Sequence, residues 1–303
     1  MKLDQKKVAI IITTYNQDIL LKKCISSLKE KTNYKNYRIF FVDDSGKRKI
    51  AKEIKKMFGD VDVAINSKNL GFSKANNIGI KRAIKSYNPD YVLLLNDDTE
   101  IIQRDWLKKM INVGESDKNI GILGCRILYP DRKLQNIGGY IRKWEIVKEL
   151  KDRKDVFDVD HVMGAFMMIK KEVIRKIGLL DEIYSPFLLE DTDYCLKAKE
   201  EGFKLKSVGN VRIIHHKGKS IDSLKNKRVM FIRFKNDMIF SFKRLKFGDA
   251  LFRVFIYLPM VAMFKKKNDE AELKFENFEL RKDFPINIGL YLISLIYAPV
   301  TVL

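Results

Sequence analysis

The chain contains only three cysteines, and none of them forms a Cys-X-X-Cys pair. Cys24, Cys125 and Cys195 lie far apart, which argues against a zinc cluster or a disulfide framework and fits a reducing cytoplasm. Residues 1–7 are polar and lead directly into an apolar run, so we expect no signal peptide. The motifs G-x-G-x-x-G and G-x-x-x-x-G-K-[ST] are also absent, so neither a dinucleotide fingerprint nor a P-loop is present.

What is abundant is positive charge and apolar surface. The 303 residues carry a formal net charge of +20 and are 46% hydrophobic, enough for the core of one large domain or two smaller ones. Such a charge is typical of proteins that meet a polyanion, a phosphorylated ligand or an anionic membrane. The alternative is a basic surface with no specific partner.

Several apolar runs in the first hundred residues are typical of strands buried on both faces of a parallel sheet. Segments with helical spacing follow these runs, so strands alternate with helices. This order predicts βαβ units joined by right-handed crossovers. The runs are Val8–Ile12, Arg38–Val42, a weaker one over 61–65, and Tyr91–Leu95.

Three of these runs end on hydroxyl, amide or carboxylate side chains. The end segments are Thr13-Thr14-Tyr15-Asn16, Asp43-Asp44-Ser45 and Asn96-Asp97-Asp98-Thr99. In a parallel sheet these ends share one edge, where ligands bind, and hard oxygen ligands suit Mg²⁺ or Mn²⁺ carried in with a diphosphate. Alternatively, Asp97 and Asp98 cap a helix that begins near Arg104, and turn chemistry explains any single set. Three converging sets favour a nucleotide pocket.

The second half has a different pattern. It contains a strand over Ile120–Leu128, loops and hairpins over 135–155, and an extended segment over Val159–Ile169 that Gly164 interrupts. A glycine inside a strand often marks a bulge or a close approach to a ligand. A helix then runs to Glu201 and stops at Gly202. The segment Val211–Ile214 leads into His215-His216.

Taken in order, these motifs resemble those of family 2 glycosyltransferases, the inverting enzymes of the GT-A fold. The similarity is greatest to the bacterial and archaeal branch that builds surface polysaccharides, which includes many rhamnosyltransferases, and it covers roughly residues 8 to 220. The motifs that carry it are Thr13-Thr14-Tyr15-Asn16, Val42-Asp43-Asp44-Ser45, Asn69-Leu70-Gly71-Phe72, Leu95-Asn96-Asp97-Asp98-Thr99, Gly164-Ala165-Phe166, Glu190-Asp191-Thr192-Asp193, and His215 five residues before Ser220.

The resemblance implies an α/β fold of GT-A type, with a Rossmann-like nucleotide-binding sheet and a mixed second half. We expect a glycosyltransferase domain over 1–220, with a nucleotide-binding half (1–100) and an acceptor half (101–220). Residues 221–303 would form a separate helical region. The residues that the resemblance assigns to the nucleotide are Thr13, Tyr15, Asp44, Asn69, Gly71 and Asp97.

The resemblance also implies a metal site and a catalytic base. Asp98 and His215 would bind Mn²⁺ or Mg²⁺, with His216 as the alternative to His215. Asn96 or Asp97 stands where relatives place the first acid of the metal motif. An inverting transfer needs a carboxylate to take the acceptor's proton, and Asp191 is the expected base. The residues expected to line the sugar and acceptor side are Gly164, Ala165, Glu190 and Trp144. The alternative is that the acids at 190, 191 and 193 only favour the helix dipole.

The last eighty residues alternate basic and apolar side chains. Residues 225–246 interleave Lys and Arg with Phe, Met and Ile, which predicts an interfacial helix on an anionic bilayer. Residues 251–264 form an apolar run too short to span a membrane, and 286–303 reach about the minimum spanning length. Because 286–303 contain Gly289 and Pro299, a re-entrant or surface-lying hairpin is at least as consistent with them. The other interpretation is ordinary amphipathic helices that close the core.

We therefore expect a metal-dependent inverting glycosyltransferase at the cytoplasmic face of the membrane, peripheral or monotopic. It would take a UDP- or dTDP-linked sugar and a glycan or lipid-linked acceptor, and no nucleic acid. One alternative is a nucleotidyltransferase of similar architecture, although such enzymes usually carry a Gly-rich basic loop after the first strand, where this chain has Thr-Thr-Tyr-Asn. A non-enzymatic alternative is a nucleic-acid-binding protein attracted by the positive charge.

Overall fold

The computed structural model describes residues 5–143, 145–149, 151–216, 227–266, 278–281 and 283–302. The chain divides into two compact units. The first comprises Met1–Ile141 and Ile146–Gly218, and the second comprises Arg142–Glu145 and Lys219–Leu303. The boundary that the sequence predicts at 220/221 lies outside the described residues, as does Ser220.

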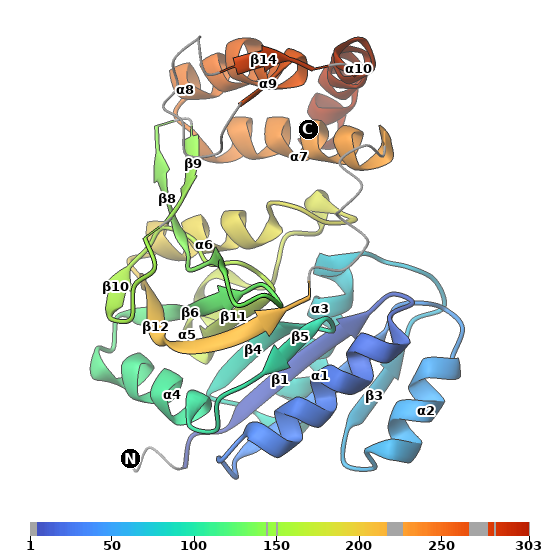
Figure 1. Cartoon of the computed structure of the whole chain (residues 1–303), viewed down its shortest axis with the longest axis vertical. Coiled ribbons are helices and arrows are strands. Elements are labelled where there is room, and N and C mark those ends of the chain that lie inside the picture. The colour runs from blue at the N-terminus through green and yellow to red at the C-terminus, as the bar shows by residue number, and fades with distance from the viewer. Residues whose placement is uncertain are drawn as a thin grey trace. The chain divides into compact units, whose positions relative to one another are not determined.

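A mixed sheet forms the centre of the first unit, with the strand order β10-β12-β6-β11-β4-β1-β2-β3 (Figure 1). Strands β3, β2, β1 and β4 are parallel, as predicted, whereas β11 runs antiparallel to both β4 and β6. On this path the strands are β1 (Val8–Thr14), β2 (Tyr37–Asp43), β3 (Asp62–Ile65), β4 (Tyr91–Asn96), β6 (Ile120–Leu128), β10 (Val156–Asp158), β11 (Phe166–Lys170) and β12 (Lys204–His215). Beside the path, β5 (Thr99–Ile101) pairs with β12 and β7 (Leu134–Asn136) with β6. The α/β class with a mixed second half is thus confirmed.

Helices cover both faces of this sheet, because its central strands are apolar on both sides. Along β1, Ile10 and Ile12 join one buried cluster and Ile11 joins the other. Alternate side chains of a strand point to opposite faces, so each face needs its own cover. One cluster includes residues of α1 (Asp18–Lys31), α2 (Lys49–Met57) and α4 (Trp106–Ser116). The other includes residues of α3 (Phe72–Tyr87), α5 (Lys171–Ile177) and α6 (Glu190–Glu200).

One alternative for the first unit is wrong, and one expectation holds only in part. Asp97 and Asp98 do not cap a helix, because β5 follows them and pairs with β12, and α4 begins only at Trp106. The extended segment expected over Val159–Ile169 is interrupted at Gly164, as predicted, because Gly164 and Ala165 form a turn, and it is a strand only in β11. Its first part forms an irregular approach in which residue 161 makes a single bridge to Gly139. The hairpin expected between 135 and 155 is present as β8 (Gly139–Arg142) and β9 (Glu145–Lys148).

The second unit is helical. Its helices are α7 (Lys227–Arg244), α8 (Phe247–Phe252), a π-helical turn η3 (Arg253–Tyr257), α9 (Leu258–Met263) and α10 (Phe284–Val302). A short ladder joins β13 (Phe264–Lys266) to β14 (Phe278–Leu280). The hairpin suggested for 286–303 is wrong, because α10 continues as one helix through Gly289 and Pro299. Among the described residues, no helix is long and apolar enough to cross a membrane.

The expected lipid-facing role of α7 is also wrong for most of its apolar residues. Seven of them are buried: Val229, Met230, Ile232, Phe234, Met238, Ile239 and Phe240. Helix α10 packs against α7, and there the ring of Phe234 meets that of Tyr291 edge-on at 5.9 Å. Helix spacing cannot show which neighbour covers an apolar stripe, and here the neighbour is another helix of the same unit.

Candidate active site

The carboxyl ends of β1, β2 and β4 meet as the sequence predicts. In the sheet register, Thr13 lies opposite Asn96 and Thr14 opposite Asp43. The hydroxyl of Thr14 donates a hydrogen bond to Asp97 Oδ2 and so joins the end of β1 to the turn after β4. Sequence reasoning chose Thr13 and missed Thr14. The alternation of side chains along β1 was the available signal, but it cannot show which of two adjacent threonines faces the turn.

Asp97 is the acid whose ionisation the fold perturbs most clearly in this turn. Burial raises the pKa of Asp97 to about 7, and the adjacent charge of Asp98 adds to that effect. The hydrogen bond from Thr14 acts in the opposite direction, because it stabilises the carboxylate. A bound cation would favour the ionised form of both neighbouring acids, so this turn suits a cation.

Asp98 and His215, the two predicted metal ligands, lie together. His215 Nε2 is 3.0 Å from Asp98 Oδ1, and both side chains are buried. The other ring nitrogen of His215, Nδ1, lies 2.7 Å from Gln135 Oε1, so it can donate there and fix the ring. That tautomer turns the Nε2 lone pair toward the carboxylate, and two electron-rich atoms at this distance need a proton or a cation between them.

His216, the alternative ligand, is engaged elsewhere. Its Nε2 lies 3.2 Å from Glu100 Oε2, and Lys23 Nζ is 2.9 Å from the same oxygen. The backbone N–H of His216 donates to the carbonyl of Asp98 at 2.8 Å, which ties β12 to the acidic turn. The structure therefore brings His215, and not His216, to Asp98. Gln135 is a positioning residue that sequence reasoning missed, because eighty positions separate it from His215 and no motif marks it.

This donor set fits a divalent cation that arrives with a diphosphate. No group of three or more His, Cys, Asp or Glu side chains suited to a metal occurs in the described part of the chain. One carboxylate and one imidazole would leave the remaining positions to phosphate oxygens and water. Mg²⁺ is commonly held in this way, by one or two protein carboxylates together with substrate phosphates.

Asp44 organises the loop before α3. Its carboxylate accepts hydrogen bonds from Asn66 Nδ2 at 2.7 Å and from the backbone N–H groups of Leu70 and Gly71 at 3.0 Å. Burial raises the pKa of Asp44, while these hydrogen bonds oppose the shift. Asn69 supports the same loop, since its Oδ1 accepts from the Gly71 N–H at 2.9 Å. The predicted nucleotide residues Asp44, Asn69 and Gly71 thus form one connected group.

The neighbouring Asp43 has a different task. It is fully buried, and its Oδ1 accepts from the N–H and the hydroxyl of Ser45 at 3.0 and 2.6 Å. Its Oδ2 accepts from the N–H of Ala51 in the first turn of α2 at 3.3 Å. Asp43 therefore closes the turn after β2 and satisfies a free N–H at the start of α2. Of these two adjacent acids, Asp43 stabilises the turn after β2 and the start of α2, whereas Asp44 holds the loop before α3.

Gly71 lies against the segment that leads to α6. The N–H of Phe72 donates to the carbonyl of Pro186 at 2.7 Å, and the Ser185 hydroxyl donates to the carbonyl of Leu70 at 3.1 Å. Gly71 has φ +85°, and a Cβ added there would lie 2.7–2.8 Å from atoms of Ser185 and Pro186. Only glycine suits such a backbone and such a close approach. The loop that Asp44 holds is therefore hydrogen-bonded to residues 185–186, which shortly precede Asp191 in the sequence.

Asp191 is positioned by the residue expected to lie beside the acceptor. The N–H of Gly164 donates to Asp191 Oδ2 at 2.7 Å, and the N–H of Thr192 donates to Oδ1 at 2.7 Å. Asp191 lies in the first turn of α6, which begins at Glu190 directly after Leu188 and Leu189, whose φ angles are +82° and +74°. Non-glycine residues with positive φ are costly and are found mostly where function requires a particular backbone. The carboxylate is half-buried, so its oxygens can still meet an acceptor hydroxyl.

Glu190 and Asp193 differ from Asp191 in their surroundings. Glu190 is buried, and its Oε2 has no hydrogen-bond partner among the residues that the structure describes. Burial raises the pKa of Glu190 well above the usual range, and the Asp191 charge adds to that effect. Asp193 is buried and accepts a hydrogen bond from the Tyr184 hydroxyl at 2.9 Å. A purely structural role for the acidic turn therefore describes Asp193 well, but it leaves the half-exposed Asp191 unexplained.

The remaining predicted residues are spread more widely. Tyr15 is 52% exposed at the end of β1, where its ring is accessible to a base or ribose. Ala165 lies in the apolar core, and its carbonyl accepts from the N–H of Asn96 at 3.1 Å, so it supports the acidic turn from below. Trp144 lies outside the described residues.

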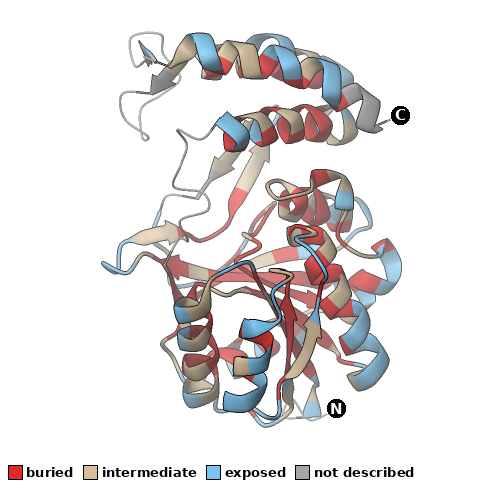
Figure 2. Ribbon diagram, turned by 90° about the vertical axis from the view of Figure 1, so that its right-hand side faces the viewer, coloured by how far each residue is buried: buried red, intermediate tan, exposed pale blue. Residues whose placement is uncertain are grey.

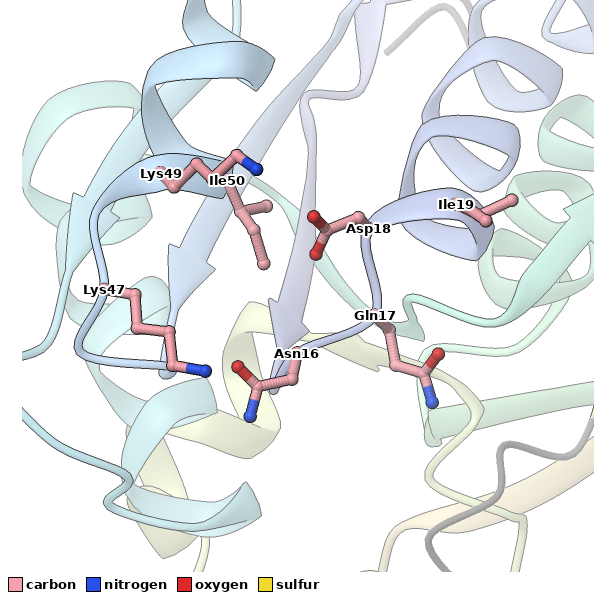
Figure 3. Close-up of a pocket in the computed structure, with 7 residues that line it drawn as sticks. All are labelled: Asn16, Gln17, Asp18, Ile19, Lys47, Lys49 and Ile50. Atoms are coloured by element: carbon pink, nitrogen blue, oxygen red, sulfur yellow. The ribbon is translucent and has the colours of Figure 1, made fainter.

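A pocket of about 660 Å³ opens between the loops that follow β1 and β2. Figure 3 shows the Asn16 and Lys47 side chains pointing toward one another across it, with Asp18 opposite Ile50. Asn16 has φ +60°, an uncommon conformation that asparagine tolerates better than most residues. Asn16, which lines this pocket, directly follows Tyr15 in the sequence. The two lysines of the pocket, Lys47 and Lys49, belong to none of the motifs found in the sequence.

Comparison with known proteins identifies the family. The model for glycosyl transferase family 2 matches residues 9–178, more than half of the chain. The chain belongs to glycosyl transferase family 2. The family matched is the one that the sequence motifs resemble, and it places the chain among glycosyltransferases rather than nucleotidyltransferases or nucleic-acid-binding proteins. Asp191 and His215 lie beyond the matched range.

Relatives of this family 2 glycosyltransferase include proteins of glycan assembly. The chain is 24% identical over 240 residues to the low-salt glycan biosynthesis hexosyltransferase Agl10 of Haloferax volcanii, covering 77% of this chain and 75% of that protein. It is 24% identical over 286 residues to protein y4gI of Sinorhizobium fredii, covering 86% of this chain but 30% of the relative. It is 21% identical over 229 residues to the O-antigen biosynthesis protein RfbC of Myxococcus xanthus, covering 71% and 18% respectively.

Solved structures show that the fold of this family 2 glycosyltransferase is GT-A. The structure of GalNAc-T7 with UDP, GalNAc and Mn²⁺ superimposes with a TM-score of 0.59 at 20% identity, covering 75% of this chain and 47% of that one. The mannosyltransferase PcManGT of Pyrobaculum calidifontis, in complex with GDP-Man and Mn²⁺, gives 0.55 at 12% identity, covering 97% and 75%. The expected GT-A architecture is therefore confirmed.

Proposed function

We propose that this glycosyltransferase moves a sugar, with inversion and with the help of a divalent metal, from a nucleotide-sugar to a glycan or lipid-linked acceptor in surface-glycan synthesis. The observation that carries the proposal is the buried pair of Asp98 and His215, 3.0 Å apart at the carboxyl edge of the sheet. It supplies a place for a cation beside the strand ends where ligands of such sheets bind.

The donor would bind over the ends of β1 and β2. The exposed ring of Tyr15 can contact the base or ribose, and the loop held by Asp44 can present backbone groups to the nucleotide. Asn16 and Lys47 in the adjoining pocket offer an amide and an ammonium group to a base carbonyl. UDP- and dTDP-sugars both carry such carbonyls and are the donors we expect.

The metal site would serve the leaving group. Asp98 and His215 would hold Mn²⁺ or Mg²⁺, and Gln135 would keep the His215 ring in its binding orientation. When bound, such a cation neutralises negative charge on the diphosphate as the bond to the sugar breaks. Asp97, whose hydrogen bond from Thr14 fixes it beside Asp98, would keep this corner negative.

Asp191 would act as the general base. In an inverting transfer the acceptor oxygen attacks the anomeric carbon from the side opposite the leaving group, and one carboxylate removes its proton. The N–H groups of Gly164 and Thr192 fix both oxygens of Asp191, so its free lone pairs point in a defined direction. Glu190 lies beside it in the same first turn of α6 and would line the acceptor side from a buried position.

Isothermal titration with UDP, dTDP and GDP, each with and without Mn²⁺, tests the donor site. We expect one nucleotide to bind at least about tenfold more tightly with Mn²⁺. His215→Ala and Asp98→Asn should remove this enhancement, whereas the matched variant His216→Ala should keep it, because His216 is bonded to Glu100. Equal loss in the two histidine variants, or an enhancement that survives Asp98→Asn, would contradict the assigned metal ligands.

A further inference from the structure

The second unit carries most of the exposed apolar side chains of the protein. Eleven of the seventeen large apolar residues that are exposed in the described chain belong to it, although it is the smaller unit. They are Phe242, Phe247, Phe252, Phe255, Ile256, Leu280, Ile286, Leu292, Ile293, Ile296 and Tyr297. Surface apolar residues are unremarkable singly, but a concentration of this kind marks an interaction surface.

On α10 these residues form one continuous stripe. Ile286, Leu292, Ile293, Ile296 and Tyr297 recur at intervals of three, four and six or seven residues, which places them on one side of the helix. In Figure 2 buried and exposed residues alternate in this way along the C-terminal helices. No charged residue occurs anywhere between Phe284 and Val302. We call this set the outer stripe of α10.

The opposite side of α10 is the more polar one. It buries Asn287, Tyr291, Ser294 and Ala298. The Tyr291 hydroxyl donates to the carbonyl of Val254 at 2.9 Å, and the Ser294 hydroxyl donates to the carbonyl of Leu290 at 2.8 Å. A helix of a water-soluble protein normally has its apolar side buried and its polar side exposed. Here the arrangement is reversed.

Polar groups are also buried in the rest of the unit, beside the apolar residues of α7. Its interior contains a salt bridge in which Arg253 lies 2.5 Å from Asp237, with both side chains at least nine-tenths buried. Ser241 and Asn236 are also fully buried. On the outside, Phe252, Phe255 and Ile256 share one side of the continuous α8–η3–α9 segment. Buried polar and ionic groups together with exposed apolar side chains are found in segments whose surroundings are lipid.

Basic residues adjoin this apolar exterior. Lys243, Arg244 and Lys246 lie between the exposed rings of Phe242 and Phe247, where α7 passes into α8. Lysine and arginine beside aromatic rings suit the headgroup region of an anionic membrane, where the rings enter the acyl boundary and the cations meet phosphate. A protein partner would instead be expected to meet a polar rim around an apolar centre.

We infer that the outer stripe of α10 and the exposed side of α8–α9 rest in the surface of an anionic bilayer. The contact differs in part from the one that the sequence suggests. Most apolar residues of α7, which the sequence places at the interface, are buried, whereas most of the exposed apolar residues lie on the later helices, including the 286–303 segment that the sequence suggests could lie on the surface. The inference stands on the second unit alone and does not depend on the reaction proposed for the first.

Vesicle co-sedimentation of the full chain tests this inference. We expect binding to phosphatidylcholine vesicles that contain phosphatidylglycerol, and at least about tenfold weaker binding to phosphatidylcholine alone. Changing Ile293→Asn and Ile296→Asn together should lower the vesicle partition coefficient at least about tenfold, since the bilayer would no longer bury these two aliphatic side chains. The matched double variant Met57→Asn and Ile84→Asn, on exposed helix positions of the first unit, should bind within about twofold of the original chain.

Three results would overturn the inference. One is absence of the unmodified chain from both vesicle pellets, and another is equal vesicle binding by the Ile293/Ile296 variant and the original. The third is a lipid-free dimer that the Ile293/Ile296 variant converts to monomer, which would assign the stripe to a second copy of the chain. Thermal melting and nucleotide titration of each variant show that the chain is folded, so a loss of binding is attributable to the stripe.

Discussion

Gly71→Ala measures how strongly the loop before α3 depends on its close contact with the segment before α6. Gly71 has φ +85° and ψ 170°, a region almost restricted to glycine, so alanine there costs about 1–3 kcal/mol in backbone strain. The new Cβ would also lie 2.7 Å from Ser185 Oγ and 2.8 Å from the Cα and the carbonyl oxygen of Pro186. Because two of these atoms are backbone, the overlap should cost about another 1–3 kcal/mol.

Gly178→Ala is the matched control. Gly178 has φ +81° and a similarly extended ψ of −154°, but a Cβ added there meets no atom within 4 Å. It should therefore show the backbone strain without the overlap. The difference between the two variants, about 1–3 kcal/mol, isolates the contact between the loop and the 185–186 segment.

Urea unfolding followed by tryptophan fluorescence gives both free energies, since Trp106 is fully buried in the first unit. Nucleotide titration should show weaker binding for Gly71→Ala alone, because the altered loop loses the hydrogen bond from the Gly71 N–H to Asp44. Equal free energies of unfolding and equal nucleotide affinities for the two variants would refute this reasoning. They would mean that the loop moves aside at no cost.

Other changes test the surroundings of the proposed base. Because burial raises the pKa of Glu190, the folded chain keeps a proton there that the unfolded chain loses once the pH exceeds the usual glutamate value. That carboxyl therefore costs stability as the pH rises toward its folded pKa, by about 1.4 kcal/mol per pH unit. The melting temperature of Glu190→Gln minus that of the original chain should accordingly increase as the pH rises from 5 to 8. A difference that stays constant across that range would count against a buried, protonated Glu190. Gly164→Ala adds a Cβ 3.2 Å from Phe72 Cζ and 3.3 Å from Asp191 Oδ2, so it should displace the Asp191 carboxylate and lower kcat about 10- to 100-fold with little change in nucleotide Kd. An unchanged kcat would show that the Gly164 N–H does not position the base.

Much of the first unit was predictable because its physics is local. The uninterrupted apolar runs of β1, β2 and β4 are typical of strands buried on both faces, and their alternation with helices favours a parallel sheet. Once they were parallel, the polar residues at their ends had to share an edge. That reasoning located Asp44, Asp97 and Asp98 without knowledge of any contact between them.

The parts that sequence reasoning missed depend on contacts between distant segments. Gln135 orients His215 from a strand eighty positions earlier, and Gly164 binds Asp191 across a gap of twenty-seven. Neither partner carries a local signal. In the second unit, the apolar side chains of α7 were visible in the sequence, but whether lipid, water or α10 covers them depends on how helices of the same unit pack. Only the structure shows that the polar residues of α10 face inward.

Turnover by Asp191→Asn tests the central claim most directly. The chain and the variant should be supplied with the donor that titration identifies, Mn²⁺ and a membrane extract as the source of acceptor, and the release of nucleoside diphosphate should be followed. Loss of a general base predicts at least about a hundredfold slower transfer, with donor Kd within about threefold of the original, because Asp191 would touch the acceptor and not the nucleotide. Transfer by the variant at a rate near that of the original chain would contradict the assignment of Asp191 as the base.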